Sequence, residues 1–98
     1  MIYNIEVKEE AKKDLKEFDM SQQILIIKQF NKIAKSPELG KLLGNKNGYD
    51  LSGCRKMYAD GKKICIVYKI VEEKIIIEVV ALGKRDDMEV YKKASQRT

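Results

Sequence analysis

The chain has 98 residues, a net charge of +5, two cysteines and no histidine. This length and 44% hydrophobic content predict one globular domain, residues 1–98. Without histidine the chain lacks the commonest general base and the commonest metal ligand, so we expect neither metal nor cofactor. The sequence contains no run near the roughly 20 apolar residues of a membrane span, and its start does not resemble a signal peptide. A cytoplasmic protein with two reduced thiols, Cys54 and Cys65, is therefore expected.

The excess positive charge is confined to the middle of the chain. Residues 35–69 carry eight Lys/Arg against three Asp/Glu, whereas the segments before and after carry six of each. A basic region of this kind suits a polyanion such as RNA. The alternative is a solvated, lysine-rich surface kept for solubility.

The first 35 residues predict a strand followed by two helices. Residues 2–7 alternate as in a short strand, and apolar residues then recur at helical spacing as far as Phe18. Asp19 and Gln22 form a capping-box pattern for a second helix, which Ser36-Pro37 ends. The apolar positions expected to form its core face are Ile24, Ile27, Phe30, Ile33 and Ala34. The mixed charges of the first helix are typical of an exposed face.

A glycine-rich loop and a hairpin follow. The loop is predicted over residues 38–50 and contains Lys41 and Lys46. Asp60-Gly61 predicts a two-residue turn, which pairs Tyr58 with Lys63. Lys56 then pairs with Cys65. Alternation places one set of side chains over the helices and leaves a second set on a basic opposite face: Cys54, Lys56, Tyr58, Lys63, Cys65, Val67 and Lys69.

A third strand, residues 74–82, should pair with two neighbours because both of its faces are apolar. It leads to Gly83 and two cations, and Asp86 and Asp87 are candidate caps for a final helix. The predicted fold is α+β, in the order β-α-α-β-β-β-α. A four-stranded antiparallel or mixed sheet should carry the two N-terminal helices on one face.

One polar cluster in this topology has the chemistry to handle phosphate. Arginine binds phosphate with two hydrogen bonds, lysine adds a point charge, and tyrosine offers a stacking surface. Such groups allow RNA cleavage by its own 2′-hydroxyl, with a lysine of lowered pKa as base and cations stabilising the phosphorus centre. The members are Lys56, Tyr58, Lys63, Lys84, Arg85 and Tyr91.

The chain resembles the RelE/ParE toxin superfamily. The likeness rests on CRKMYADGKK, IVYKI, IIIEVVALGKR and EVYKKA, while the first 50 residues match only in element order. The resemblance implies a bacterial toxin that cuts mRNA in the ribosomal A site and is blocked by an antitoxin, as a monomer or a toxin-antitoxin hetero-oligomer. Arg85 matches the family's phosphate-contacting arginine, Tyr91 its stacking tyrosine, and Lys56 a basic residue of the second strand.

Other lysines complete the expected site. Lys63 is a further catalytic candidate, and the expected RNA contacts are Lys84, Tyr58, Lys62, Lys41 and Lys46. Two positions depart from the family: Tyr58 replaces a basic residue, and Cys65 replaces an arginine that faces the scissile phosphate. Cys65 is expected to be a semi-exposed residue without a role or, less favoured, an oxidation sensor beside Lys56. A disulfide with Cys54 is not expected.

Three other functions remain open from the sequence. Cys65 favours a non-catalytic protein that keeps the fold and binds an antitoxin or RNA. A ParE-like inhibitor of DNA gyrase needs no nuclease cluster. A generic basic RNA-binding domain is the third.

Overall fold

A computed structural model describes residues 2–46, 48–84 and 89–97. Its helices are α1 (Glu9–Lys16), α2 (Met20–Lys35) and α3 (Glu89–Arg97), with two 3-10 turns, η1 (Pro37–Leu39) and η2 (Glu72–Lys74). The strands are β1 (Asn4–Val7), β2 (Lys41–Leu42), β3 (Asn45–Lys46), β4 (Tyr49–Asp50), β5 (Cys54–Ala59), β6 (Ile64–Val71) and β7 (Ile76–Lys84).

The five-stranded sheet has the order β1-β7-β6-β5-β2, with β1 parallel to β7 and the other neighbours antiparallel. The predicted α+β fold is confirmed, and β7 pairs with two strands as expected. The loop expected over residues 38–50 is wrong in part, because it contains η1, the edge strand β2 and the small hairpin β3-β4. β2 supplies the fifth strand. Within the described residues, no helix is both long and apolar enough to cross a membrane.

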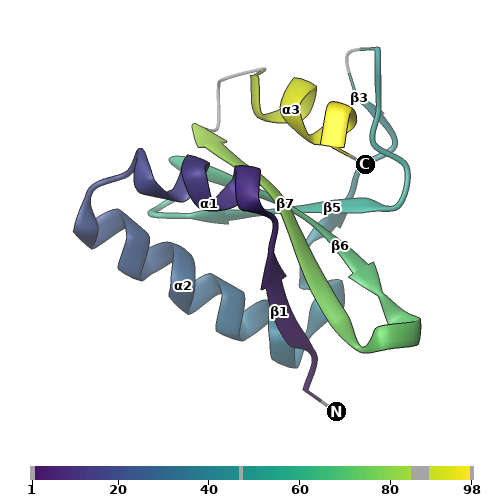
Figure 1. The fold of residues 1–98 in the computed structure, drawn as a ribbon, viewed down its shortest axis with the longest axis horizontal. Helices are drawn as coiled ribbons and strands as arrows, with labels where there is room; N and C mark the ends of the chain where they lie inside the picture. The colour runs from purple at the N-terminus through teal and green to yellow at the C-terminus, as the bar shows by residue number, and fades with distance from the viewer. Residues whose placement is uncertain (1, 47, 85–88, 98) are drawn as a thin grey trace.

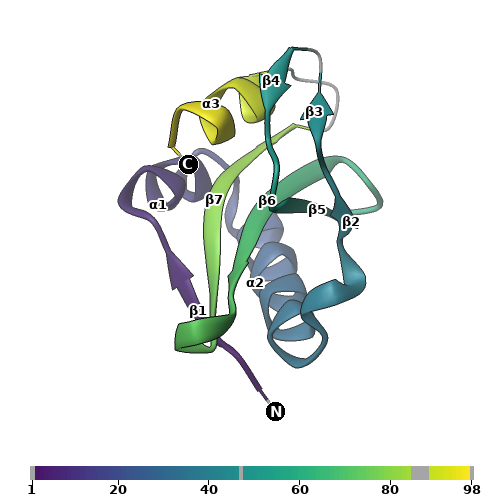
Figure 2. The ribbon, with the colours of Figure 1, turned by 90° about the vertical axis from the view of Figure 1, so that its right-hand side faces the viewer.

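Helices cover both faces of the sheet (Figure 1). α1 and α2 pack on one face, where buried side chains of both helices join Ile66, Tyr68 and Ile77 in one core. α3 and the β3-β4 hairpin lie beside each other over the opposite face (Figure 2). There a second core contains Cys54, Cys65 and other buried residues. The expectation that this face lies away from any core is therefore wrong for Cys54, Cys65 and Val67, which the second core buries.

α2 begins and ends as predicted. The Asp19 carboxylate accepts a hydrogen bond from the Gln22 N–H at 2.8 Å, and the reciprocal bond of the capping box is present. Ile24 and Ile27 were expected in the core but are exposed, because the buried stripe is centred on Ile26. Two residues turn a helix by about 200°, so Ile24 lies on the other side from Ile26.

The hairpin turn lies one residue later than predicted. Gly61 and Lys62 both have positive φ, 61° and 71°, and the Lys63 N–H donates to the Asp60 carbonyl at 3.1 Å. The predicted pairing is consequently wrong by two residues: Tyr58 pairs with Cys65, not with Lys63. A shift of two preserves which side chains share a face, so the predicted alternation survives.

Asp14 anchors α3, although the sequence placed it on an exposed helix face. Its carboxylate is 4% exposed and accepts hydrogen bonds from Arg97 at 2.8 Å, the Leu82 N–H at 3.2 Å and Lys93 at 3.3 Å. Burying a charge is costly unless it is paired, and here it is paired with two cations. Asp14 thus joins α1, β7 and α3, and this contact holds α3 over the second core.

Candidate functional site

Four of the side chains singled out from the sequence meet where β5 and β6 approach α3. Lys56 and Tyr58 lie two residues apart on β5 and therefore point to the same face. Cys65 is the direct partner of Tyr58 on β6, and Tyr91 of α3 contacts Cys65. We name Lys56, Tyr58, Cys65 and Tyr91 the β5-α3 cluster.

Lys56 is the positive charge of this cluster. Its Nζ donates a hydrogen bond to the Tyr58 hydroxyl at 2.8 Å and lies 5.1 Å from the centroid of the Tyr58 ring. That hydrogen bond, with a smaller contribution from the Tyr91 hydroxyl, raises the pKa of Lys56 above its ordinary value. A lysine that acts as a base near neutral pH needs the opposite shift. Lys56 is therefore suited to stabilise negative charge and not to remove a proton.

Tyr91 covers Cys65. The Cys65 thiol donates to the Tyr91 hydroxyl at 4.0 Å, Tyr91 is 4% exposed, and Cys65 is fully buried. Burial is the main cause that raises the pKa of the Tyr91 hydroxyl. The expectation that Cys65 is semi-exposed is wrong, and its burial argues against an oxidation sensor, which needs an accessible thiol. Both cysteines are free, as expected, and burial raises the pKa of the Cys54 thiol.

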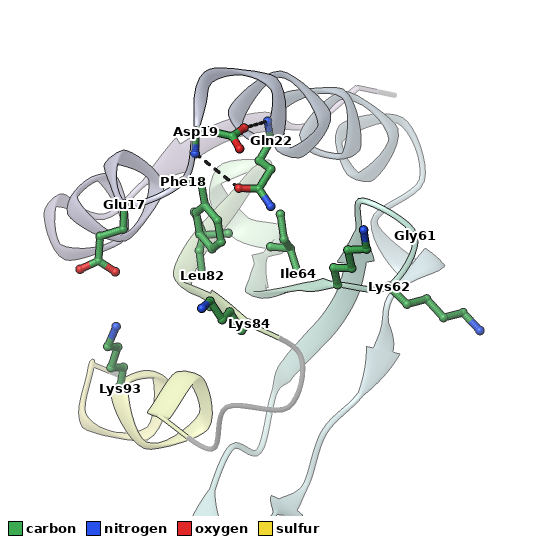
Figure 3. A pocket seen from close by; sticks show the side chains of 12 residues that line it. Glu17, Phe18, Asp19, Gln22, Gly61, Lys62, Ile64, Leu82, Lys84 and Lys93 are labelled. Atoms are coloured by element: carbon green, nitrogen blue, oxygen red, sulfur yellow. Dashed lines mark hydrogen bonds between the residues drawn. The ribbon is translucent and has the colours of Figure 1, made fainter.

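Three other predicted site residues line a separate groove at the end of the sheet where α1 meets α2. Lys62 and Lys63 come from the β5-β6 turn and Lys84 from the end of β7. In Figure 3 the Phe18 ring points into this groove, Lys84 lies beneath it, and Lys62 extends outward at the rim. In the observed register Lys56 pairs with Val67, four residues from Lys63, so the expectation that Lys56 and Lys63 share a patch is wrong.

Two further predicted RNA contacts, Lys41 and Lys46, come from β2 and β3. Lys41 of β2 is exposed and pairs with Lys56, which brings two lysines to neighbouring strands at this edge. Lys46 belongs to β3. Arg85, Asp86 and Asp87 lie outside the described residues. Lys84, which precedes Arg85, pairs with Ile64 at the end of β7 where Gly83 pairs with Cys65.

Two residues that support the site were not singled out from the sequence. The Arg55 guanidinium donates to the Gly40 carbonyl at 2.7 Å. The buried Tyr68 hydroxyl accepts from the Gly40 N–H at 2.8 Å and donates to the Pro37 carbonyl at 2.6 Å. Both contacts hold the start of β2, and hence Lys41, against β5. The sequence did offer a signal for Tyr68: it is a tyrosine on the otherwise apolar face of the IVYKI run, and a buried hydroxyl requires a hydrogen-bond partner.

The β5-α3 cluster offers one cation, two tyrosine hydroxyls and a buried thiol. In the ranges 2–46, 48–84 and 89–97, no three His, Cys, Asp or Glu residues are grouped to hold a metal ion.

Comparisons with known proteins agree in family and fold. The model of the ParE toxin of type II toxin-antitoxin systems matches residues 5–89. A RelE-like toxin protein of Escherichia coli is 34% identical over 99% of this chain and 98% of its own length. The mRNA interferase toxin RelE of Escherichia coli K12 is 28% identical over the same shares.

Solved structures show the same likeness. A free mutant of the E. coli toxin RelE has a TM-score of 0.81 and 26% identity, covering 99% of this chain and 98% of its own. A RelE mutant bound to a peptide of its antitoxin has a TM-score of 0.73 and 25% identity, covering 96% and 95%.

Proposed function

Because this chain belongs to the RelE/ParE superfamily of type II toxin-antitoxin toxins, we propose that it is a ribosome-dependent mRNA endoribonuclease of the RelE-like branch. It would act on mRNA in the ribosomal A site, in the cytoplasm, and be held inactive by a cognate antitoxin. The observation that carries the proposal is the Lys56-Tyr58 pair, a fixed cation beside two tyrosines at the margin of α3. Two relatives named as mRNA interferases, and a relative solved with an antitoxin peptide, support it.

The reaction requires no metal. The RNA 2′-hydroxyl attacks the adjacent phosphorus and gives its proton to water, while the 5′-oxygen leaves and takes up a proton from water. The products are a 2′,3′-cyclic phosphate and a 5′-hydroxyl. Negative charge builds on the phosphoryl oxygens in the transition state, and a preorganised cation is worth most there because it needs no rearrangement. We assign this role to Lys56, together with Arg85, which the resemblance makes the phosphate contact.

Lys56 is also relevant to position 65, where this chain has a cysteine and the family has an arginine. A thiol carries none of the positive charge that the family places at this position, and Tyr91 separates Cys65 from solvent. We propose that Lys56, on the neighbouring strand β5, supplies this charge instead. Lys56 is two residues from Tyr58, the direct partner of Cys65, and Lys41 pairs with Lys56 on its other side.

The test is inducible expression followed by mapping of mRNA 5′ ends. The parent should arrest growth and cut translated mRNA. Lys56→Ala should reduce cleavage by about 10²- to 10³-fold, the cost of losing one transition-state contact. Arg85→Ala should abolish it, and the exposed Lys74→Ala, at the far end of the β6-β7 hairpin, serves as the control that changes charge without touching the cluster. Full toxicity of Arg85→Ala would overturn the assignment.

The matching family model favours one second candidate, a ParE-like inhibitor of DNA gyrase. This function predicts induction of the DNA-damage response with intact mRNA, unaffected by Lys56→Ala. A parent that binds its antitoxin yet neither cuts mRNA nor damages DNA would instead be a non-catalytic member of the superfamily.

A further inference from the structure

A row of side chains on the outer flank of α2 is exposed although most of it is apolar. Met20, Ile24 and Ile27 are 70%, 49% and 48% exposed. Asn31, also exposed, continues the same spacing of four, three and four residues. This is the spacing of a coiled-coil seam, in which a single polar Asn sets the register. We name these four residues the α2 seam.

We propose that the α2 seam is the docking surface for an acidic, amphipathic helix of the antitoxin, an inference that rests on the proposed toxin-antitoxin pairing. Apolar anchors at such spacing are how a helical segment is recognised by a partner. The seam is rigidly presented because α2 is held on its other sides. Gln29 donates to the Tyr58 carbonyl at 2.6 Å, and the Ala34 carbonyl accepts from the Tyr3 N–H at 2.9 Å.

Charge identifies the partner as acidic. From Met20 to Lys35, α2 contains no acidic residue, and its exposed lysines Lys28, Lys32 and Lys35 lie beside the seam. Acidic residues flanking the apolar face of a partner helix would pair with these lysines, as charged positions do beside a coiled-coil seam.

The same lysines disfavour two other occupants. A second copy of this chain packed seam to seam would bring three lysines from each copy together, and like charges at an interface are costly. RNA would use the lysines but would leave Ile24 and Ile27 uncovered, because single-stranded RNA is bound by aromatic stacking and positive charge. An acidic amphipathic helix satisfies both the charge and the apolar surface.

The experiment measures the affinity of the full-length toxin for the protein encoded by the adjacent reading frame. Ile24→Gln/Ile27→Gln should weaken the complex about 10- to 100-fold, because binding then no longer buries the apolar surface of two isoleucine side chains. The matched control is Leu39→Gln/Leu42→Gln, which removes two similarly exposed leucines elsewhere and should leave the affinity unchanged. Lys28→Glu/Lys32→Glu should also weaken the complex, with a smaller dependence on salt.

Each outcome decides the matter. Equal affinity of the seam variant and the parent overturns the proposal, as does equal weakening by the control. A free toxin that is dimeric, and becomes monomeric in the seam variant, assigns the seam to a second copy instead. Loss of RNA binding alone assigns it to RNA. Cleavage of mRNA by the free seam variant is measured separately and should match the parent, because the β5-α3 cluster lies on the other face of the sheet. Absence of cleavage by the parent would therefore refute the nuclease and not the docking surface.

Discussion

Replacing the buried carboxylate that anchors α3, Asp14→Ala, should destabilise the protein and uncover Cys65. The substitution removes a charge-assisted hydrogen bond to Arg97 and leaves the buried Leu82 N–H without its acceptor. Loss of the charge-assisted hydrogen bond costs about 1.5–3 kcal/mol, and the unsatisfied buried N–H costs about 1–3 kcal/mol. Because alanine forms helices better than aspartate, the substitution also stabilises α1 by roughly 0.6 kcal/mol. The expected loss is about 3 kcal/mol, which for a domain of this size lowers Tm by roughly 12–24 °C.

Two assays check this expectation. Urea unfolding gives the loss of stability directly, and the rate of thiol labelling at Cys65, in a Cys54→Ala background, reports opening of α3. If the whole loss falls on the docking of α3, about 3 kcal/mol increases the open population by roughly 150-fold.

The matched control is Glu10→Ala. Glu10 approaches the same Arg97 at 4.0 Å, but its side chain is 55% exposed. An exposed pair of this kind contributes at most about 1 kcal/mol. Equal effects of Asp14→Ala and Glu10→Ala would refute the reasoning that burial makes Asp14 the anchor.

Three further predictions concern single side chains. Tyr68→Phe should cost about 1–3 kcal/mol in urea unfolding, because two backbone groups at the start of β2 lose their shared hydroxyl; an unchanged midpoint would contradict this. Ile75→Asn should stabilise by about 1 kcal/mol, because a β-branched residue is held at φ 55° and asparagine tolerates positive φ; a lower Tm would count against it. Tyr58→Phe removes the acceptor that raises the pKa of Lys56, so this pKa should fall and the cation be lost at lower pH. Cleavage by the parent should be insensitive to Lys56 titration over roughly pH 6 to 9, and the alkaline decline should begin earlier in Tyr58→Phe; superimposable profiles would refute the role of Tyr58.

Local signals in the sequence were sufficient for most of the elements. The Asp19-Gln22 capping box and Ser36-Pro37 delimit α2 because both act through bonds and sterics within a few residues. Alternation along β5 and β6 separated the two faces correctly, even though the turn was placed one residue too early. Asp60 also has a positive φ, 52°. The Asp60-Gly61 pair therefore located the turn correctly but did not determine which two residues close it.

What the sequence did not predict depends on contacts between distant segments. Asp14 and Arg97 are 83 residues apart, and nothing near Asp14 distinguishes it from the exposed charges of α1. The basic face of β5 and β6 was expected to lie away from the core, because alternation shows which side chains share a face but not what covers that face. α3 covers that face, and Cys65 is buried beneath Tyr91, which contradicts its expected partial exposure.

We propose that this toxin cuts mRNA with Lys56 and Arg85 as its cations. The most direct test is the mapping of mRNA 5′ ends in cells that express the parent, Lys56→Ala, Arg85→Ala or Lys74→Ala. We expect new ends within translated codons for the parent and for Lys74→Ala, strongly reduced ends for Lys56→Ala, and none for Arg85→Ala. Growth arrest by all four proteins without any new mRNA ends would contradict it.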